Sequence, residues 1–106
     1  MKWYRNLYCS DNLEDEKKKI IKEIRHHKRQ WNIYVITLAR NNYDLFDIYH
    51  VNVLYQPYYR KREDEITVIG IAKGKEEAMK LVEKIVMDVY QKTGDCKVKE
   101  YVMLNY

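Results

Sequence analysis

The chain has 106 residues, with 20 lysines and arginines against 16 aspartates and glutamates, three glycines and one proline. This length suits one domain with one core, and the composition excludes low-complexity and linker-rich proteins. The apolar runs are far shorter than the roughly 20 residues needed to cross a bilayer. We therefore expect one cytoplasmic domain over residues 1–106 with no membrane partner.

The first 30 residues predict a short strand followed by a basic helix. Residues 2–9 mix aromatic and polar side chains, which suits a strand that ends before Ser10. Within residues 12–28, four apolar residues recur at helical spacing on one stripe: Leu13, Ile20, Ile21 and Ile24. The other face of this helix is almost wholly charged, and the positive excess of the chain lies before Trp31.

Two segments have the pattern of central strands, because both of their faces are apolar. Residues 32–39 and 66–72 are apolar almost continuously, without the alternation of a half-exposed strand. This pattern is typical of parallel strands that helices cover on both sides. Both segments are therefore placed at the centre of the sheet.

The segment between these strands has a weaker pattern. Asn41 or Asn42 can cap a helix over about residues 43–55. However, Val51 and Val53 would also suit a strand, so both interpretations stay open.

The last third of the chain predicts a long helix and an edge strand. Gly74 precedes a helix over about residues 75–92, which Gly94 closes as a C-terminal cap. Residues 97–103 alternate between apolar and polar and suit an edge strand. The element order βαβαβαβ predicts a single α/β domain with a three- to four-stranded, mostly parallel sheet and helices on both faces. An antiparallel edge strand on either side is the alternative.

Four segments carry a family resemblance: LYCS at 7–10, YVITL at 34–38, IGIAKG at 69–74 and VYQKTG at 89–94. Through them, nearly the whole chain resembles a family of small uncharacterised proteins from gut anaerobes of the clostridial type. The resemblance implies the α/β fold. It carries over no activity, cofactor or functional residue.

The turn Lys73-Gly74-Lys75 is a candidate phosphate site. It could offer backbone N–H groups and two ammonium groups to an anion where the helix dipole is favourable. It completes neither a P-loop nor a dinucleotide fingerprint, and Glu76 and Glu77 follow immediately. An ordinary capped turn is the alternative.

The basic helix is a candidate site for nucleic acid or another polyanion. Lysines and arginines on one surface of this helix could follow a phosphate backbone: Lys18, Lys22, Arg25 and Arg29. The affinity for such a polyanion would fall as the salt concentration rises. The alternative is a solvated helix whose bases near its end complement the dipole.

A tyrosine-rich segment at residues 55–62, which overlaps a loop expected around residues 57–64, is a candidate interface. Three tyrosines and one arginine could anchor a protein partner or a second copy of the chain, or could stack on nucleobases: Tyr55, Tyr58, Tyr59 and Arg60. The alternative is packing with each hydroxyl at the rim of the core.

The sequence contains no assembled catalytic set. Cys9 follows a strand and precedes a helix, where a thiol pKa can be lowered, which leaves a thiol enzyme as a third hypothesis. His26, His27 and His50 lack metal-ligand spacing, so we expect no metal or cofactor. The leading hypothesis is a non-catalytic binding or protein-interaction module, with a homodimer as one form of it. The second is a binder of nucleic acid or a phosphorylated ligand.

Overall fold

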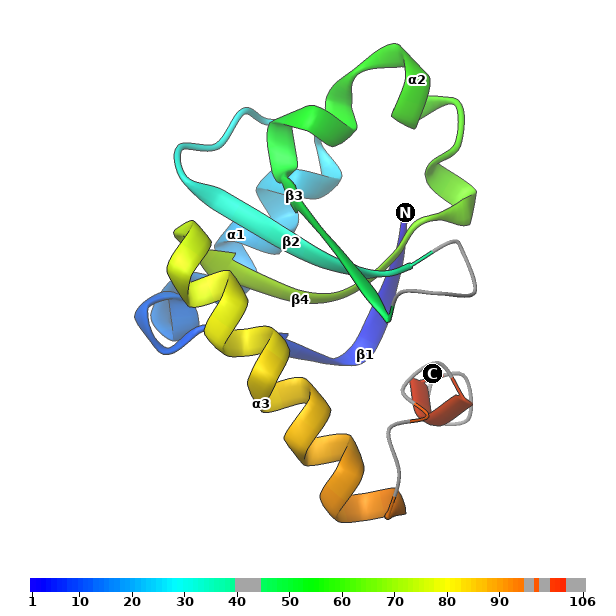
Figure 1. Cartoon of the computed structure of the whole chain (residues 1–106). Coiled ribbons are helices and arrows are strands. Elements are labelled where there is room, and N and C mark those ends of the chain that lie inside the picture. Colours follow the sequence, from blue (N-terminus) through cyan, green and yellow to red (C-terminus); the bar gives the residue numbers. More distant parts are fainter. Residues whose placement is uncertain (40–44, 95–96, 98–99, 103–106) are drawn as a thin grey trace.

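The centre of the molecule is a four-stranded mixed sheet (Figure 1). The computed structural model describes residues 1–39, 45–94, 97 and 100–102. The strands are β1 (Lys2–Cys9), β2 (Ile33–Leu38), β3 (Phe46–His50) and β4 (Thr67–Lys73), and they lie in the order β1-β4-β2-β3. β1 runs parallel to β4, whereas β2 runs antiparallel to both β4 and β3. The prediction of a mostly parallel sheet in βαβαβαβ order is therefore wrong.

One part of the error is the helix that was expected over residues 43–55; the other is that β1 and β2, which α1 joins, run in opposite directions. The segment expected to be helical contains β3 instead, and η2 (Val51–Tyr55), a 3-10 helix, follows it directly. A parallel crossover needs a dozen or more residues, but only the seven residues 39–45 join β2 to β3. The chain therefore turns back antiparallel. Val51 and Val53 belong to η2, not to a strand, and the proposed caps Asn41 and Asn42 lie outside the described residues.

The other helices follow the sequence prediction unevenly. The helix expected at 12–28 is divided into η1 (Asp11–Glu16) and α1 (Lys17–Arg25). The loop expected around 57–64 holds α2 (Pro57–Arg60) and the start of η3 (Glu63–Glu65). α3 (Lys75–Thr93) agrees with the predicted range 75–92. Gly94 closes α3 with a φ of 77°, and its amide donates to the Tyr90 carbonyl at 2.7 Å.

The C-terminal edge strand expected at 97–103 is wrong for residues 100–102. Residues 100–102 are helical, and Val102 is fully buried against the sheet face that α3 covers. Residues 98, 99 and 103 lie outside the described part of the chain. The edge positions of the sheet belong to β1 and β3.

α1 ends earlier than predicted because the backbone turns left-handed at His27, whose φ is 55°. The amide of Lys28 donates to the Glu23 carbonyl at 2.9 Å, as in the Schellman motif that usually has glycine at the left-handed position. The His27 ring lies 2.6 Å from a Glu63 carboxylate oxygen and edge-on to Tyr55. These contacts hold the loop after α1 against the segment that contains η3.

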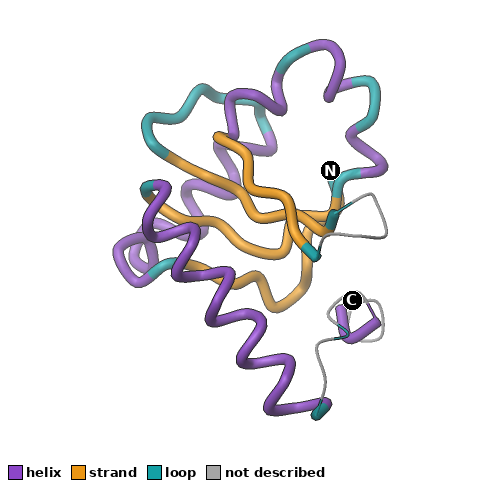
Figure 2. Tube along the Cα trace, viewed as in Figure 1, coloured by secondary structure: helices purple, strands orange, loops and turns teal. Residues whose placement is uncertain are grey.

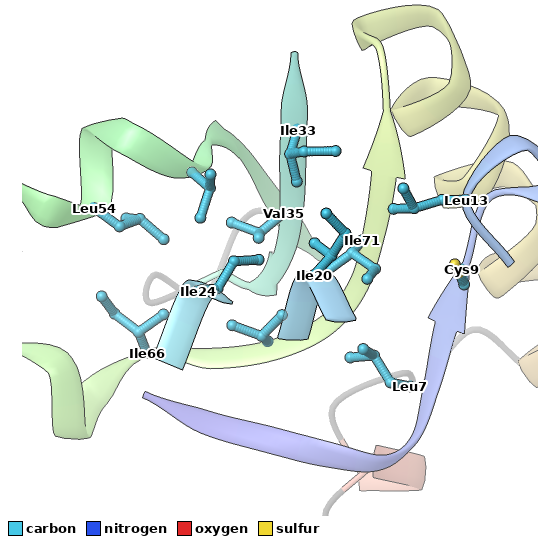
Figure 3. Packing of buried hydrophobic residues seen from close by; sticks show 12 residues of the cluster. Leu7, Cys9, Leu13, Ile20, Ile24, Ile33, Val35, Leu54, Ile66 and Ile71 are labelled. Atoms are coloured by element: carbon cyan, nitrogen blue, oxygen red, sulfur yellow. The ribbon is translucent and has the colours of Figure 1, made fainter. Parts of the chain in front are cut away.

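The two faces of the sheet carry two hydrophobic clusters. On one face, Ile20 and Ile24 of α1 lie among strand residues such as Val35 and Ile71, as Figure 3 shows. The opposite face is covered by α3, which crosses the sheet diagonally (Figure 2). The buried members of this second cluster are Tyr4, Ile36, Ile69, Ala72, Ala78, Leu81, Ile85, Val89 and Val102.

β1 carries a large bulge at the edge of the sheet. Trp3 pairs with Val68 and Tyr8 pairs with Gly70, so five steps along β1 match two steps along β4. The three extra residues lie within 4–7 and interrupt the pairing. Bulges are frequent at sheet edges and beside functional sites, because they redirect side chains.

A second irregularity, in β4, brings α3 close to the sheet. Ile36 pairs with Gly70, but the next residue of β2, Thr37, pairs with Val68, so β4 holds one extra residue here. A Cβ atom at Gly70 would lie 3.1 Å from Leu81 Cδ2. The missing side chain lets α3 approach this closely. In the described part of the chain, none of the helices has the length and apolar character needed to cross a membrane.

Candidate functional site

A groove of about 350 Å³ lies between the bulged part of β1 and α1. Its apolar lining consists of Trp3, Tyr4, Leu7 and Ile21. Its charged lining consists of Arg5, Lys17, Lys18 and Arg25. Among the described residues of the lining, every charged residue is basic, so this part of the groove is electropositive as well as partly aromatic.

Helical spacing explains why α1 presents these bases together. Lys17, Ile21 and Arg25 are four residues apart and therefore lie on one side of the helix. This side borders the stripe of Ile20 and Ile24, which is buried in the first cluster. Burial of the stripe fixes the rotation of α1, and that rotation places the bases along β1.

The bulge explains how β1 forms the other wall. Trp3 is half-buried against the first cluster, whereas Tyr4 is 3% exposed and belongs to the second cluster on the opposite face. Arg5 is exposed within the bulge. The wall thus combines a partly accessible indole ring with an exposed guanidinium group.

Two contacts join the walls of the groove. The Arg25 guanidinium carbon lies 5.7 Å from the centre of the Trp3 ring, a cation–π distance. The Lys17 ammonium donates a hydrogen bond to the Leu7 carbonyl at 2.8 Å. A lysine ammonium has three donors, so Lys17 keeps two for a ligand.

The groove contains half of the predicted polyanion residues. Lys18 and Arg25 line it, whereas Lys22 is exposed on α1 outside the lining. Arg29 is exposed in the loop beyond the end of α1. The sequence prediction missed Trp3 and Arg5. The available signal was the mixture of aromatic and basic residues in the first strand, but the bulge that brings them to α1 has no obvious mark in the sequence.

The candidate phosphate turn uses its backbone groups within the protein. The Lys73 amide donates to Ser10 Oγ at 3.2 Å, and the Gly74 amide donates to the Asn32 carbonyl at 2.8 Å. The Lys73 carbonyl accepts from Asn12 Nδ2 at 3.0 Å. Gly74 has a φ of 101°, which accounts for a glycine here without any ligand. Phosphate binding at Lys73-Gly74-Lys75 stays a prediction, and two of its presumed donors are already bonded.

The tyrosine cluster lies in η2 and α2, away from the groove. The Tyr55 hydroxyl donates to the Lys28 carbonyl at 2.8 Å, and burial raises the pKa of Tyr55 to about 12. Tyr59 packs on the first cluster and meets Tyr58 edge-on, with ring centres 5.0 Å apart. Tyr58 is 56% exposed and Arg60 is also exposed. Tyr55 and Tyr59 thus have the contacts of core-rim packing, and an interface at this loop stays a prediction.

Cys9 does not have the environment of a reactive thiol. It is 4% exposed, and burial raises the pKa of Cys9 to about 11. A small cavity of about 100 Å³ beside it has charges of both signs, from Lys80, Lys84, Asp11 and Glu77. Cys96, the other cysteine, lies outside the described residues.

The histidines have structural partners where the chain is described. His50 accepts a hydrogen bond at Nδ1 from the Asn52 amide at 3.2 Å and so caps η2. His27 contacts Glu63, as described above. Across residues 1–39, 45–94, 97 and 100–102, no group of three potential metal ligands comes together.

Comparison with known proteins adds no further constraint. No family model, no curated protein and no solved structure matches this chain. The resemblance to small proteins of clostridial-type anaerobes stays a prediction. Any functional proposal therefore depends on the geometry of the chain itself.

Proposed function

We propose that this chain is a non-catalytic binding module for single-stranded nucleic acid, and that the groove between β1 and α1 receives a base and its neighbouring phosphates. The observation that carries the proposal is the combination of the Trp3 ring with charged lining residues that, in the described part of the chain, are all basic. Proteins that bind single strands combine aromatic stacking surfaces with a positive groove. The high pKa of buried Cys9 is consistent with a binding role without thiol chemistry.

The dimensions of the groove favour an unpaired strand over a duplex. Its volume of about 350 Å³ is at the lower end of the roughly 300–1,000 Å³ typical of ligand sites, and suits one nucleotide unit. A base can reach the indole of Trp3 only when it is unstacked from its neighbours. Arg5, Lys18 and the free donors of Lys17 would then bind its phosphates.

The lysines and arginines outside the groove favour a nucleic-acid strand over a free nucleotide as the ligand. Lys19, Lys22 and Arg29 are exposed on α1 and in the loop after it. They can contact further phosphates of a strand, which a mononucleotide lacks. Glu23 is withdrawn from this surface by an ion pair with Lys28 at 3.2 Å.

The test is fluorescence anisotropy with a labelled oligonucleotide of about 12 nucleotides, within the range of single-strand sites. The double substitution Arg5→Gln and Lys18→Gln should reduce the slope of log affinity against log salt by about 1.4, because each phosphate contact contributes roughly 0.7. The matched control removes two exposed lysines elsewhere, Lys61→Gln and Lys80→Gln, and should leave the slope unchanged.

A substitution at Trp3 separates stacking from charge. Trp3→Leu keeps an apolar side chain against the first cluster but should weaken binding by roughly 1–3 kcal/mol through lost stacking. Trp31→Leu, at a residue that is 81% exposed and outside the groove, is the control. The proposal would be refuted if the double variant in the groove and the double control variant lost the same affinity. Equal affinity for duplex and single strand would refute it as well.

The cytoplasmic location expected from the sequence is part of this proposal, and the free thiol of Cys9 suits that compartment.

A further inference from the structure

β3 has an edge whose backbone groups point away from the sheet. The amide of Ala39 donates to the Leu45 carbonyl at 3.1 Å, and hydrogen-bonded pairs alternate along an antiparallel ladder. The N–H and C=O groups of Phe46 and Ile48 and the N–H of His50 therefore face outward, whereas the His50 carbonyl starts the hydrogen bonding of η2. Within the described chain, β2 is the strand paired with β3, so this outer row has no strand partner.

The two edges of the sheet differ in protection. β1 has a bulge and carries Lys2 and Arg5, features that prevent strand-to-strand pairing between molecules. β3 has the sequence FDIYH, without lysine, arginine or proline, and its register with β2 has no bulge. Its central residue, Ile48, is 38% exposed. Such an edge is a ready template for another strand.

We propose that the partner of this edge is β3 of a second copy, paired antiparallel about a two-fold axis at Ile48. This pairing joins two four-stranded sheets into a continuous sheet of eight strands. The strand is self-complementary in this register. Ile48 lies opposite its own copy, Phe46 lies opposite His50, and Asp47 lies opposite Tyr49.

Charge selects this register over its neighbours. A shift by one pair toward the start of β3 would place Asp47 directly opposite Asp47, and like charges in that position are destabilising. The opposite shift would place Tyr49 opposite Tyr49 and would pair only Ile48 and His50 through outward backbone groups. The register centred on Ile48 keeps Phe46, Ile48 and the His50 amide paired.

The side-chain contacts reinforce the backbone pairing. Phe46 packs against the second cluster, on the sheet face that α3 covers, and Ile48 lies on the same side because strand residues two apart share a face. Pairing would cover Ile48 with its own copy. On the other face, the pairing places each Asp47 opposite Tyr49 of the other copy, so no two carboxylates face each other.

The experiment measures the mass of the purified protein by sedimentation equilibrium from about 1 µM to about 1 mM. The wild type should change from monomer to dimer within this range. Ile48→Lys places a lysine on each strand at the axis and should weaken dimerisation by at least about tenfold, because the change occurs twice per interface. Met79→Lys, at a residue that is 56% exposed on α3, is the matched control and should dimerise like the wild type.

A cross-link tests the register without weakening the fold. Ile48→Cys with Cys96→Ser should form an intermolecular disulfide on mild oxidation, because paired residues at the axis are close enough for the bond. Met79→Cys with Cys96→Ser should not. A wild type that stays monomeric to about 1 mM, or an Ile48→Lys protein that is folded by circular dichroism and dimerises normally, would overturn the proposal. A dimer that fails to cross-link through Ile48→Cys would overturn the register.

Discussion

The contact between Gly70 and α3 gives a quantitative test of how the sheet and helix pack. In Gly70→Ala the new methyl group would lie 3.1 Å from Leu81 Cδ2 and 3.5 Å from both Ile36 Cδ1 and Tyr8 Cβ. Leu81 is 3% exposed and Ile36 is fully buried, so neither side chain can move into solvent. The methyl group must therefore displace α3 or force Leu81 from its rotamer.

The expected cost follows from two opposing effects. Overpacking a core by one methyl group costs about 1–3 kcal/mol, whereas replacing glycine with alanine recovers about 0.4–1 kcal/mol by restricting the unfolded chain. The net destabilisation in Gly70→Ala should be about 1 kcal/mol. In a domain of this size that lowers the melting temperature by about 4–8 °C.

A double-mutant cycle with Leu81→Val assigns the cost to one contact. The shorter side chain removes the atom that the new methyl group would meet, so Gly70→Ala should cost much less in the Leu81→Val background. The assay is urea unfolding of the four proteins. Equal costs in both backgrounds would refute the reasoning, as would a Gly70→Ala protein as stable as the wild type.

Three other predictions concern single side chains. The Tyr8 hydroxyl donates a hydrogen bond of 2.5 Å to Asp88, and this bond holds the pKa of Asp88 below its usual value. The ionised carboxylate therefore stabilises the fold above the unfolded pKa of about 3.9. This stabilisation is lost as the pH falls through the lower pKa of the folded state. Asp88→Asn should thus lower the melting temperature most at neutral pH, and the difference should shrink below about pH 4; a constant difference would contradict it. Glu63→Ala removes the partner of His27 and should cost at most about 1 kcal/mol in urea unfolding, because both side chains are part-exposed. The rate at which Cys9 reacts with a thiol reagent should equal the rate of global unfolding, because the native protein buries the thiol. Rapid labelling of the native protein would contradict this buried position.

Long apolar patterns predicted the elements that they dominate. The strands at β2 and β4 are apolar on both faces, and α3 has a continuous apolar stripe, so each appears close to its predicted range. Burial on both faces was correctly inferred from this pattern. The direction of the strands was not, because continuous apolarity reports coverage by helices and says nothing about which way a neighbouring strand runs.

Short elements with mixed composition could not be predicted in the same way. β3 has only five residues, and the alternation of Phe46 and Ile48 with Asp47 and Tyr49 competes with a helical interpretation of the same segment. Without this strand, the predicted sheet lacks the antiparallel pair of β2 and β3. The candidate groove shows the same limit. Its helical wall follows from the spacing of the bases on α1, but its strand wall depends on a bulge between Trp3 and Tyr8 that only the pairing with β4 reveals.

The two proposed surfaces lie at opposite edges of one sheet, and this arrangement has a consequence for affinity. β1 and β3 are separated by β4 and β2, so pairing through β3 leaves the groove of each copy open. A dimer would then present two grooves to one oligonucleotide. Once the first groove has bound it, the second groove would bind it at a high effective concentration. Affinity should rise steeply once an oligonucleotide is long enough to reach both grooves. This rise should disappear in Ile48→Lys, whereas binding of short oligonucleotides should not change. No residue of β3 lines the groove, so Ile48→Lys cannot act on the groove directly. If Ile48→Lys loses the rise with long oligonucleotides and keeps its affinity for short ones, the loss must come from the broken dimer, and the two surfaces act together.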